Sequence, residues 1–161
     1  MAAPTPVAVR RVGRPPDETA EDRILRAGLD VYGLEGWNGT TMSAIGREAG
    51  VGKALLYSRF TSPADILVTA FETYVPELSG EFDNIRDLLL AEANRMAALY
   101  LGEHALAVRR ALLDARAGVG PFPQIADQMS LRTVLPMRAH VRAAIKRGEL
   151  PPWTGVTQLL D

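Results

Sequence analysis

The side chains best suited to contact a partner molecule are concentrated in one short segment, residues 53–60. A helix over this segment turns Leu56 and Phe60, which are four residues apart, towards the protein interior. The remaining side chains are then left to face outward: Lys53, Ala54, Leu55, Tyr57, Ser58 and Arg59. Lysine and arginine donate to guanine edges or phosphates, a tyrosine hydroxyl donates to phosphate, and small apolar side chains contact thymine methyl groups. This outward face is therefore a candidate surface for binding DNA.

A second short helix is expected just before this one, followed by a tight turn. Thr41 is a suitable N-cap, and Met42, Ile45 and Ala49 then fall on one helical face. Gly50 comes next, where a sharply turning chain needs the left-handed conformation that glycine adopts at little cost. The Thr41 hydroxyl, at a helix N-terminus, could also share a phosphate with backbone N–H groups. The pair predicts a helix–turn–helix, with a simple helical hairpin as the alternative.

The arrangement Thr-x-x-x-Ile-Gly-x-x-Ala-Gly-Val-Gly-x-x-x-Leu-Tyr-x-x-Phe, residues 41–60, resembles the DNA-binding segment of the tetracycline-repressor (TetR) family of bacterial transcription regulators. The resemblance implies that the outward side chains of residues 53–59 meet DNA. It also implies an N-terminal three-helix head that binds DNA, followed by a helical body that binds an effector and dimerises. Two positions depart from the family pattern: Gly52 replaces a commoner Ser or Thr, and Pro63 stands where a phosphate-contacting Lys is usual.

Residues 1–16 contain four prolines and no usable helical periodicity, which predicts a disordered basic arm. Arg10, Arg11 and Arg14 supply its positive charge. Such an arm can lie along phosphates or insert Arg14 into a minor groove. A solvated tail without DNA contact explains the composition equally well.

Residues 17–61 are predicted to form the DNA-binding head. Its first helix is expected over Asp17–Gly36, where early carboxylates suit the positive end of the helix dipole. The apolar stripe of this helix consists of Ile24, Ala27, Gly28, Val31 and Leu34. Trp37 follows a break in the pattern and is expected to fill the core over the three packed helices.

Residues 62–161 are predicted to form a helical body for effector binding and dimerisation. Ser62 is a plausible N-cap, and Pro63 suits the first helical position. Periodicity then predicts a series of helices: Pro63–Val75, Asn84–Leu101, His104–Ala117 and Gln124–Gly148. Pro136 is expected to kink or divide the last of these, and residues 154–161 resemble the opening turns of another helix. Because the family resemblance implies two long helices at this point, the body is expected to be incomplete; the alternative is that the chain pairs through a shorter surface.

In the family that the chain resembles, the effector lies among the helices that follow the head. This implies a small-molecule effector, whose identity the sequence does not indicate. The candidate lining residues combine apolar walls with a few polar groups: Met96, Tyr100, His104, Arg109 and Phe122. The alternative is that the methionine and the aromatic residues are simply part of the core.

The chain offers little for catalysis or cofactor binding. It has no cysteine, and its two histidines, His104 and His140, stand in no metal-ligand spacing. It also lacks a Gly-x-Ser-x-Gly elbow, a Walker loop and a dinucleotide fingerprint. We therefore expect no enzymatic activity, no catalytic residue, no cofactor and no metal site. With no apolar run near the ~18 residues of a membrane span and no signal-peptide pattern, we expect a cytoplasmic protein without a membrane partner.

These observations favour a sequence-specific transcriptional regulator, expected to act as a ligand-responsive repressor and as a homodimer on a palindromic double-stranded DNA operator. The formal net charge of −1 does not by itself indicate a nucleic-acid binder. The rival hypothesis is a helical small-molecule-binding protein whose head no longer binds DNA, which Gly52, Pro63, the nearly neutral net charge and the early chain end would suit. A steep loss of DNA binding with salt distinguishes the regulator from this rival.

Overall fold

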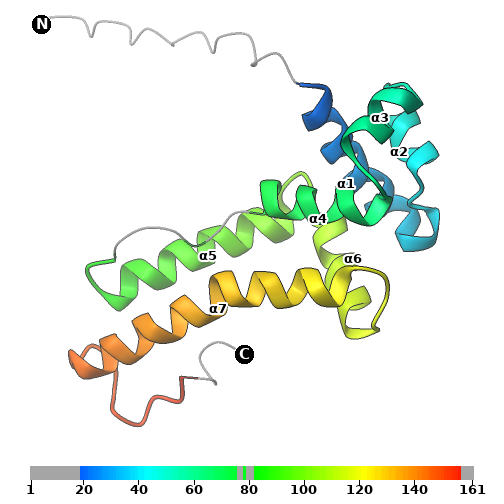
Figure 1. Cartoon of the computed structure of the whole chain (residues 1–161). Helices are drawn as coiled ribbons and strands as arrows, with labels where there is room; N and C mark the ends of the chain where they lie inside the picture. Colours follow the sequence, from blue (N-terminus) through cyan, green and yellow to red (C-terminus); the bar gives the residue numbers. More distant parts are fainter. Residues whose placement is uncertain (1–18, 76–77, 79–81, 157–161) are drawn as a thin grey trace, which may run out of the picture.

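The computed structural model describes residues 19–75, 78 and 82–156, and within these residues the chain forms seven α-helices and no β-strand (Figure 1). The helices are α1 (Ala20–Gly39), α2 (Met42–Glu48), α3 (Lys53–Arg59), α4 (Pro63–Tyr74), α5 (Ile85–Leu101), α6 (Ala105–Arg116) and α7 (Phe122–Lys146). The all-α prediction is confirmed. The predicted arm over residues 1–16 lies outside the described residues.

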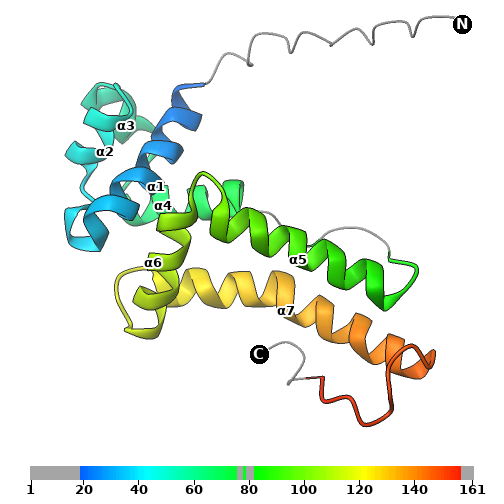
Figure 2. The ribbon, with the colours of Figure 1, turned by 180° about the vertical axis from the view of Figure 1, so that it is seen from behind.

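The helices form a compact end and an elongated end (Figures 1 and 2). α1, α2 and α3 gather at one end; α5 runs towards this end and α7 runs away from it, so the two helices lie side by side and antiparallel. α4 packs against α1, while α6 packs against both α1 and α7. α1 therefore contacts both the helix–turn–helix, through α2, and the rest of the protein, through α4 and α6.

α1 begins at a capping box and bends near its end. The Thr19 hydroxyl accepts from the Asp22 N–H at 3.1 Å, and the Asp22 carboxylate accepts from the Thr19 N–H at 3.2 Å. The predicted helix end at Gly36 is partly right, because Gly36 interrupts the helix with a φ of 75° but the helical segment resumes as far as Gly39. The Thr40 hydroxyl donates to the Gly36 carbonyl at 2.7 Å, which fixes the chain at the exit from this bend.

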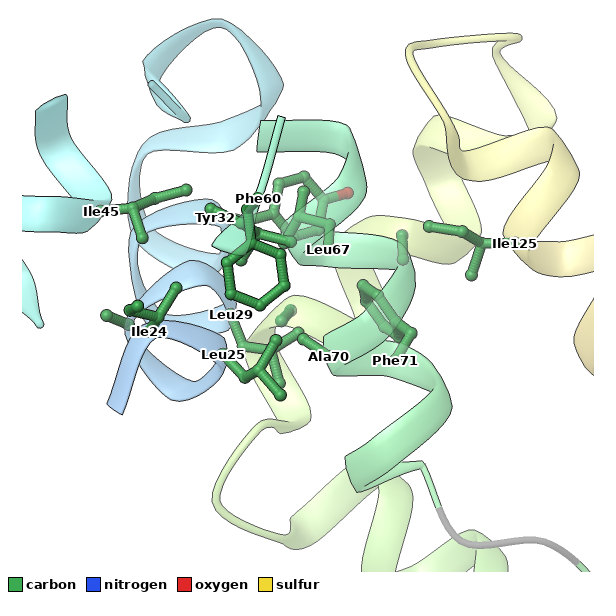
Figure 3. Close-up of a cluster of buried hydrophobic side chains, with 14 of the residues drawn as sticks. Ile24, Leu25, Leu29, Tyr32, Ile45, Phe60, Leu67, Ala70, Phe71 and Ile125 are labelled. Carbon is green, nitrogen blue, oxygen red and sulfur yellow. The ribbon is translucent and has the colours of Figure 1, made fainter. Parts of the chain in front are cut away.

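One continuous apolar core joins α1 to α4, α6 and α7 (Figure 3). Tyr32 of α1 is fully buried in it, with its ring stacked on Phe122 at a centroid distance of 4.4 Å. The Tyr32 hydroxyl donates to the Asp114 carboxylate at 2.7 Å. Burial, together with this carboxylate, raises the pKa of Tyr32 beyond its usual range. The phenol stays protonated and remains a hydrogen-bond donor between α1 and α6.

Of two residues predicted to lie in the core of the head, Trp37 packs against the core and Leu34 does not. Trp37 packs against the main core, as expected, and its ring also lies edge-on against Phe122 at the start of α7, with ring centroids 5.9 Å apart. Leu34 is 73% exposed although it was placed on the buried stripe. At this point α1 meets α6 through Gly33, where an added Cβ would lie 3.3 Å from the Ala107 nitrogen, and Leu34 lines an open surface cavity beside Leu106 and Ala107.

The far end of the α5–α7 pair has a small core of its own. Its buried residues are Leu88, Met137 and Val141. Beside it, the Glu149 carboxylate accepts a hydrogen bond from the Ile85 N–H at 2.6 Å and another from the Arg147 guanidinium. Because Ile85 is the first residue of α5, the segment after α7 caps α5 and ties the ends of the two helices together.

The boundaries of the last helix differ from the prediction. α7 is one helix of 25 residues that includes Pro136, so the predicted division does not occur. Residues 154–156 are not helical, and residues 157–161, where the further helix was expected to continue, lie outside the described residues. Among the described helices, none is both long and apolar enough to cross a membrane.

The contact between α1 and α4 leaves no room for a side chain at Gly28. A Cβ added there would lie 2.8 Å from Ile66 Cγ2. We expect Gly28→Val to destabilise the protein by about 1–3 kcal/mol, because buried neighbours must shift to admit the added atoms. Urea unfolding followed by circular dichroism measures this change. Ala93→Val, at an exposed position of α5, controls for the helix propensity of valine; an equal loss in both variants would contradict the packing argument.

The cap on α5 predicts a pH dependence. The pKa of Glu149 is lowered, because its carboxylate accepts hydrogen bonds from Arg147 and from the Ile85 N–H. A group whose pKa is depressed by folding stabilises the protein above its unfolded value, about 4.3 for glutamate, and this contribution disappears as the pH falls through the folded value. We expect Glu149→Gln to lower the thermal midpoint at pH 7, and this difference from the wild type to shrink below about pH 4. Glu72→Gln, an exposed control on α4, should change the midpoint less; a Glu149→Gln deficit that is unchanged in acid would rule out a charge-dependent cap.

Candidate nucleic-acid interface

The turn between α2 and α3 is built by a cap at its start and a left-handed glycine at its centre. The Thr41 hydroxyl accepts from the Ala44 N–H at 3.1 Å, as expected of the predicted N-cap. After α2, Gly50 has a φ of 64°, and the Val51 N–H donates to the Gly46 carbonyl at 3.0 Å. The predicted left-handed turn at Gly50 is confirmed, and it redirects the chain into α3.

The two helices are closest at Gly46. A Cβ on this residue would lie 3.3 Å from Leu56 Cδ2, which is tighter than an ordinary contact. Leu56 and Phe60 are 1% and 5% exposed, so the predicted inner face of α3 is confirmed. The buried face of α2 consists of Met42, Ala44, Ile45 and Gly46. Packing of these inner faces fixes which side of α3 meets solvent.

The opposite side of α3 is exposed, as predicted. Its residues are Lys53, Ala54, Leu55, Tyr57, Ser58 and Arg59. Tyr57 is 58% exposed, which leaves its hydroxyl accessible to a partner. A short helix of this kind fits a DNA major groove, which is about 12 Å wide.

Arg59 is already engaged by a carboxylate of another helix. Its guanidinium donates to the Glu21 side chain at 2.6 Å, which links the end of α3 to the first turn of α1. Sequence reasoning took Glu21 only as a helix-start charge and missed the pair, since the two residues are 38 apart. Both side chains are more than 40% exposed, so the pair adds little stability but restricts the direction of the guanidinium. A phosphate or a guanine would have to compete with Glu21 for Arg59.

The other predicted DNA contacts differ in the groups they leave available. The Ser58 hydroxyl donates to the Leu55 carbonyl at 2.7 Å, so its remaining capacity is as an acceptor. The Thr41 oxygen is occupied by its capping bond, and its hydroxyl hydrogen can still be donated to a phosphate. Lys53 is exposed on the first turn of α3. Arg14 lies outside the described residues.

The predicted effector residues do not form a single site. A cleft of about 630 Å³ lies between α4, α5, α6 and α7, and Met96, Tyr100 and Phe122 line it. His104 instead lines a smaller neighbouring cavity of about 280 Å³. Arg109 lines neither and donates to the Tyr100 carbonyl at 2.8 Å. Among the described residues, no group of three or more His, Cys, Asp or Glu side chains is arranged to hold a metal ion.

Arg26, which sequence reasoning did not single out, links three parts of the structure beside the smaller cavity. Its guanidinium donates to both carboxylate oxygens of Glu103, at 2.9 and 3.0 Å, and lies 4.9 Å from the centroid of the Tyr74 ring. Glu103 belongs to the turn between α5 and α6, and Tyr74 is the last residue of α4. Nearby, burial raises the pKa of Asp30, whose carboxylate is 3.9 Å from His104 Nδ1. These contacts tie α1 to both α4 and the start of α6.

The sequence of the chain is similar to those of bacterial transcription regulators. Residues 24–70, which run from α1 through the helix–turn–helix into α4, match the family model described as bacterial regulatory proteins, tetR family. The chain is also similar to uncharacterized HTH-type transcriptional regulators of Mycobacterium bovis and of two strains of Mycobacterium tuberculosis. Each is 26% identical over 159 residues, a match that covers 93% of this chain and 75% of the relative.

The start of α3 can be strengthened by one hydroxyl. Gly52 is the N-cap, with a φ of −72° and a ψ of 152°, it provides no side-chain cap, and a Cβ there would meet nothing within 4 Å. We expect Gly52→Ser to raise stability by roughly 0.2–0.5 kcal/mol, because the serine oxygen can accept from a free N–H of the first turn. Gly52→Ala has no acceptor and should lower stability. Urea unfolding of the three proteins measures both changes, and a serine variant no more stable than the alanine variant would show that α3 does not begin here.

Proposed function

We propose that the chain is a member of the tetR family of bacterial regulatory proteins, and that it is a ligand-responsive repressor that binds a palindromic operator as a homodimer. The observation that carries the proposal is the exposed outer face of α3, which the buried inner face of a helix–turn–helix holds in a fixed direction. In this proposal residues 17–61 bind DNA, and residues 62–161 bind the effector and dimerise. The protein acts in the cytoplasm, on the chromosome, and is not an enzyme.

The chemistry of each exposed side chain suggests its part in the DNA contact. Lys53 and Arg59 donate to phosphates or to guanine O6 and N7, with Arg59 exchanging Glu21 for the DNA. Tyr57 and Thr41 donate their hydroxyl hydrogens to phosphates. The small and apolar side chains meet base edges and thymine methyl groups: Ala54, Leu55 and Ser58. Arg14 enters the adjacent minor groove in this proposal.

Two-fold symmetry follows from the size of the contact. One helix of seven residues reaches only a few base pairs, so a second copy related by a two-fold axis is needed to define a longer site. The matching operator is a palindrome whose half-sites lie about one helical turn, roughly 10 base pairs, apart. We place the dimer contact in the body, so that the two α3 helices are presented on one side of the dimer.

The effector is proposed to act through α4 and the contacts of Arg26. α4 joins the helix–turn–helix to the body and packs against α1 along its length. Arg26 touches the end of α4 and the turn before α6, so a shift of either changes the position of α1. An effector that binds more tightly when the two heads are wrongly spaced shifts the population away from DNA binding, by as much as its affinities for the two states differ.

Salt-dependent DNA binding distinguishes this proposal from a ligand-binding protein with an inactive head. The chain has two lysines, Lys53 on α3 and Lys146 at the far end of α7, and these form a matched pair. With a DNA fragment from beside its own gene, we expect Lys53→Ala to weaken binding and to reduce the slope of log affinity against log salt by about 0.9, the release of counterions from one phosphate. Lys146→Ala should change neither quantity.

Removing one hydroxyl from the outer face of α3 gives a second test of its contact with DNA. Tyr57→Phe should weaken binding by about 0.5–1.5 kcal/mol, the value of a single hydrogen bond, and leave thermal stability unchanged because Tyr57 is exposed. Fluorescence anisotropy titrations at several salt concentrations measure the DNA affinity of Lys53→Ala, Lys146→Ala and Tyr57→Phe. Equal effects of Lys53→Ala and Lys146→Ala would show that α3 is not the DNA-binding helix, and binding that is absent at every salt concentration would favour the rival function.

A further inference from the structure

We propose that the 630 Å³ cleft between α4 and α7 binds an amphipathic monoanion, a carboxylate joined to an apolar body, and that Arg116 recognises its charge. The inference rests on the proposed effector-binding role of the body and adds the chemical class of the effector. The volume of the cleft falls within the range of small-molecule sites, about 300–1,000 Å³.

The charge of the cleft is set by arginine. Arg95 and Arg116 line the cleft, and no aspartate or glutamate is among the described residues that line it. Arg95 is matched by Glu92, whose carboxylate accepts from its guanidinium at 2.6 and 2.7 Å. This pair lies within α5 and is mostly buried, with Arg95 only 10% exposed, so the charge of Arg95 is balanced by Glu92.

Arg116 is the cation without such a match. It is the last residue of α6, and in the described part of the chain it forms no ion pair. The nearest carboxylate in sequence, Asp114, already accepts the hydrogen bond from Tyr32. A guanidinium at the edge of an apolar cleft pairs well with a carboxylate, because its two parallel N–H groups match the two oxygens.

The walls of the cleft suit a flexible apolar chain or ring. They are formed mainly by Met96, Leu99, Phe122, Ile125 and Met129, with Tyr100 at one side. Methionine side chains adapt to irregular shapes, so this lining can close around bodies of different outline. The Thr133 hydroxyl, which also faces the cleft, is occupied by the Met129 carbonyl at 2.8 Å and adds little polarity. An uncharged polar ligand would therefore leave most of its groups without partners.

Phe122 connects the cleft to α1. Its ring lines the cleft, stacks on Tyr32 and contacts the edge of Trp37. A ligand against Phe122 thus alters the surroundings of Trp37, which gives a fluorescence signal for binding. The second tryptophan, Trp153, is 84% exposed, so Trp153→Phe leaves Trp37 as the single reporter without disturbing the core.

The test uses three probes of equal chain length, decanoate, decanol and decylamine, added to the Trp153→Phe protein below the micelle concentrations of the two ions and the solubility limit of decanol. We expect decanoate to bind at least tenfold more tightly than the other two. Within the series octanoate, decanoate and dodecanoate, affinity should rise about fourfold for each methylene that becomes buried. Equal affinity for decanoate and decanol, or tighter binding of decylamine, would overturn the proposal.

Variants at the charged edge assign the recognition. Arg116→Gln should remove the preference for decanoate over decanol, Arg116→Lys should retain part of it, and Arg142→Gln, an exposed control on α7, should leave it unchanged. A preference that survives in Arg116→Gln would overturn the role of this residue. Operator binding is measured on the same samples. A protein that binds DNA but does not bind decanoate would contradict the ligand class alone. A protein that binds decanoate but not DNA would contradict the repressor function alone.

Discussion

The simultaneous packing of α1 against α2, α4 and α6 is the constraint on which the rest of the structure depends. Tyr32 lies in α1, the helix that supports the head, and contacts two helices of the body. Its ring stacks on Phe122 of α7, and its hydroxyl donates to Asp114 of α6. Gly28 makes room for the Ile66 side chain of α4, and Gly33 lets the α6 backbone at Ala107 approach α1 closely. The DNA-binding unit and the body thus share one core, and a rearrangement in either changes the packing of the other.

This shared core explains how so short a recognition helix is held in one direction. α3 has seven residues, too few to be stable as an isolated helix, so its orientation comes from burial of Leu56 and Phe60. Its outer face then carries the charges and hydroxyls proposed to meet DNA. The Arg59–Glu21 pair adds a restraint at the end of the same helix and keeps the guanidinium near α1 until a competing anion arrives.

Short-range sequence patterns predicted the structure of the head well. They did not predict side-chain contacts between residues far apart in the sequence. The cap at Thr41, the left-handed turn at Gly50 and the inward spacing of α3 all depend on neighbours within a few residues, where periodicity is informative. Glu103 lies 77 residues from its partner Arg26, and no sequence pattern brings them together. The predicted effector residues line different cavities for a similar reason. Helical spacing does not determine how α5 and α6 cross, and this crossing decides which cavity a residue such as His104 lines.

The central claim is that α3 reads a symmetric DNA site. Hydroxyl-radical footprinting of the DNA beside the gene, with the whole 161-residue chain, tests it most directly. Two symmetry-related protected stretches on one face of the duplex, about 10 base pairs apart, are the predicted result. Uniform protection along the fragment, or none at concentrations where the protein is folded, would contradict the account.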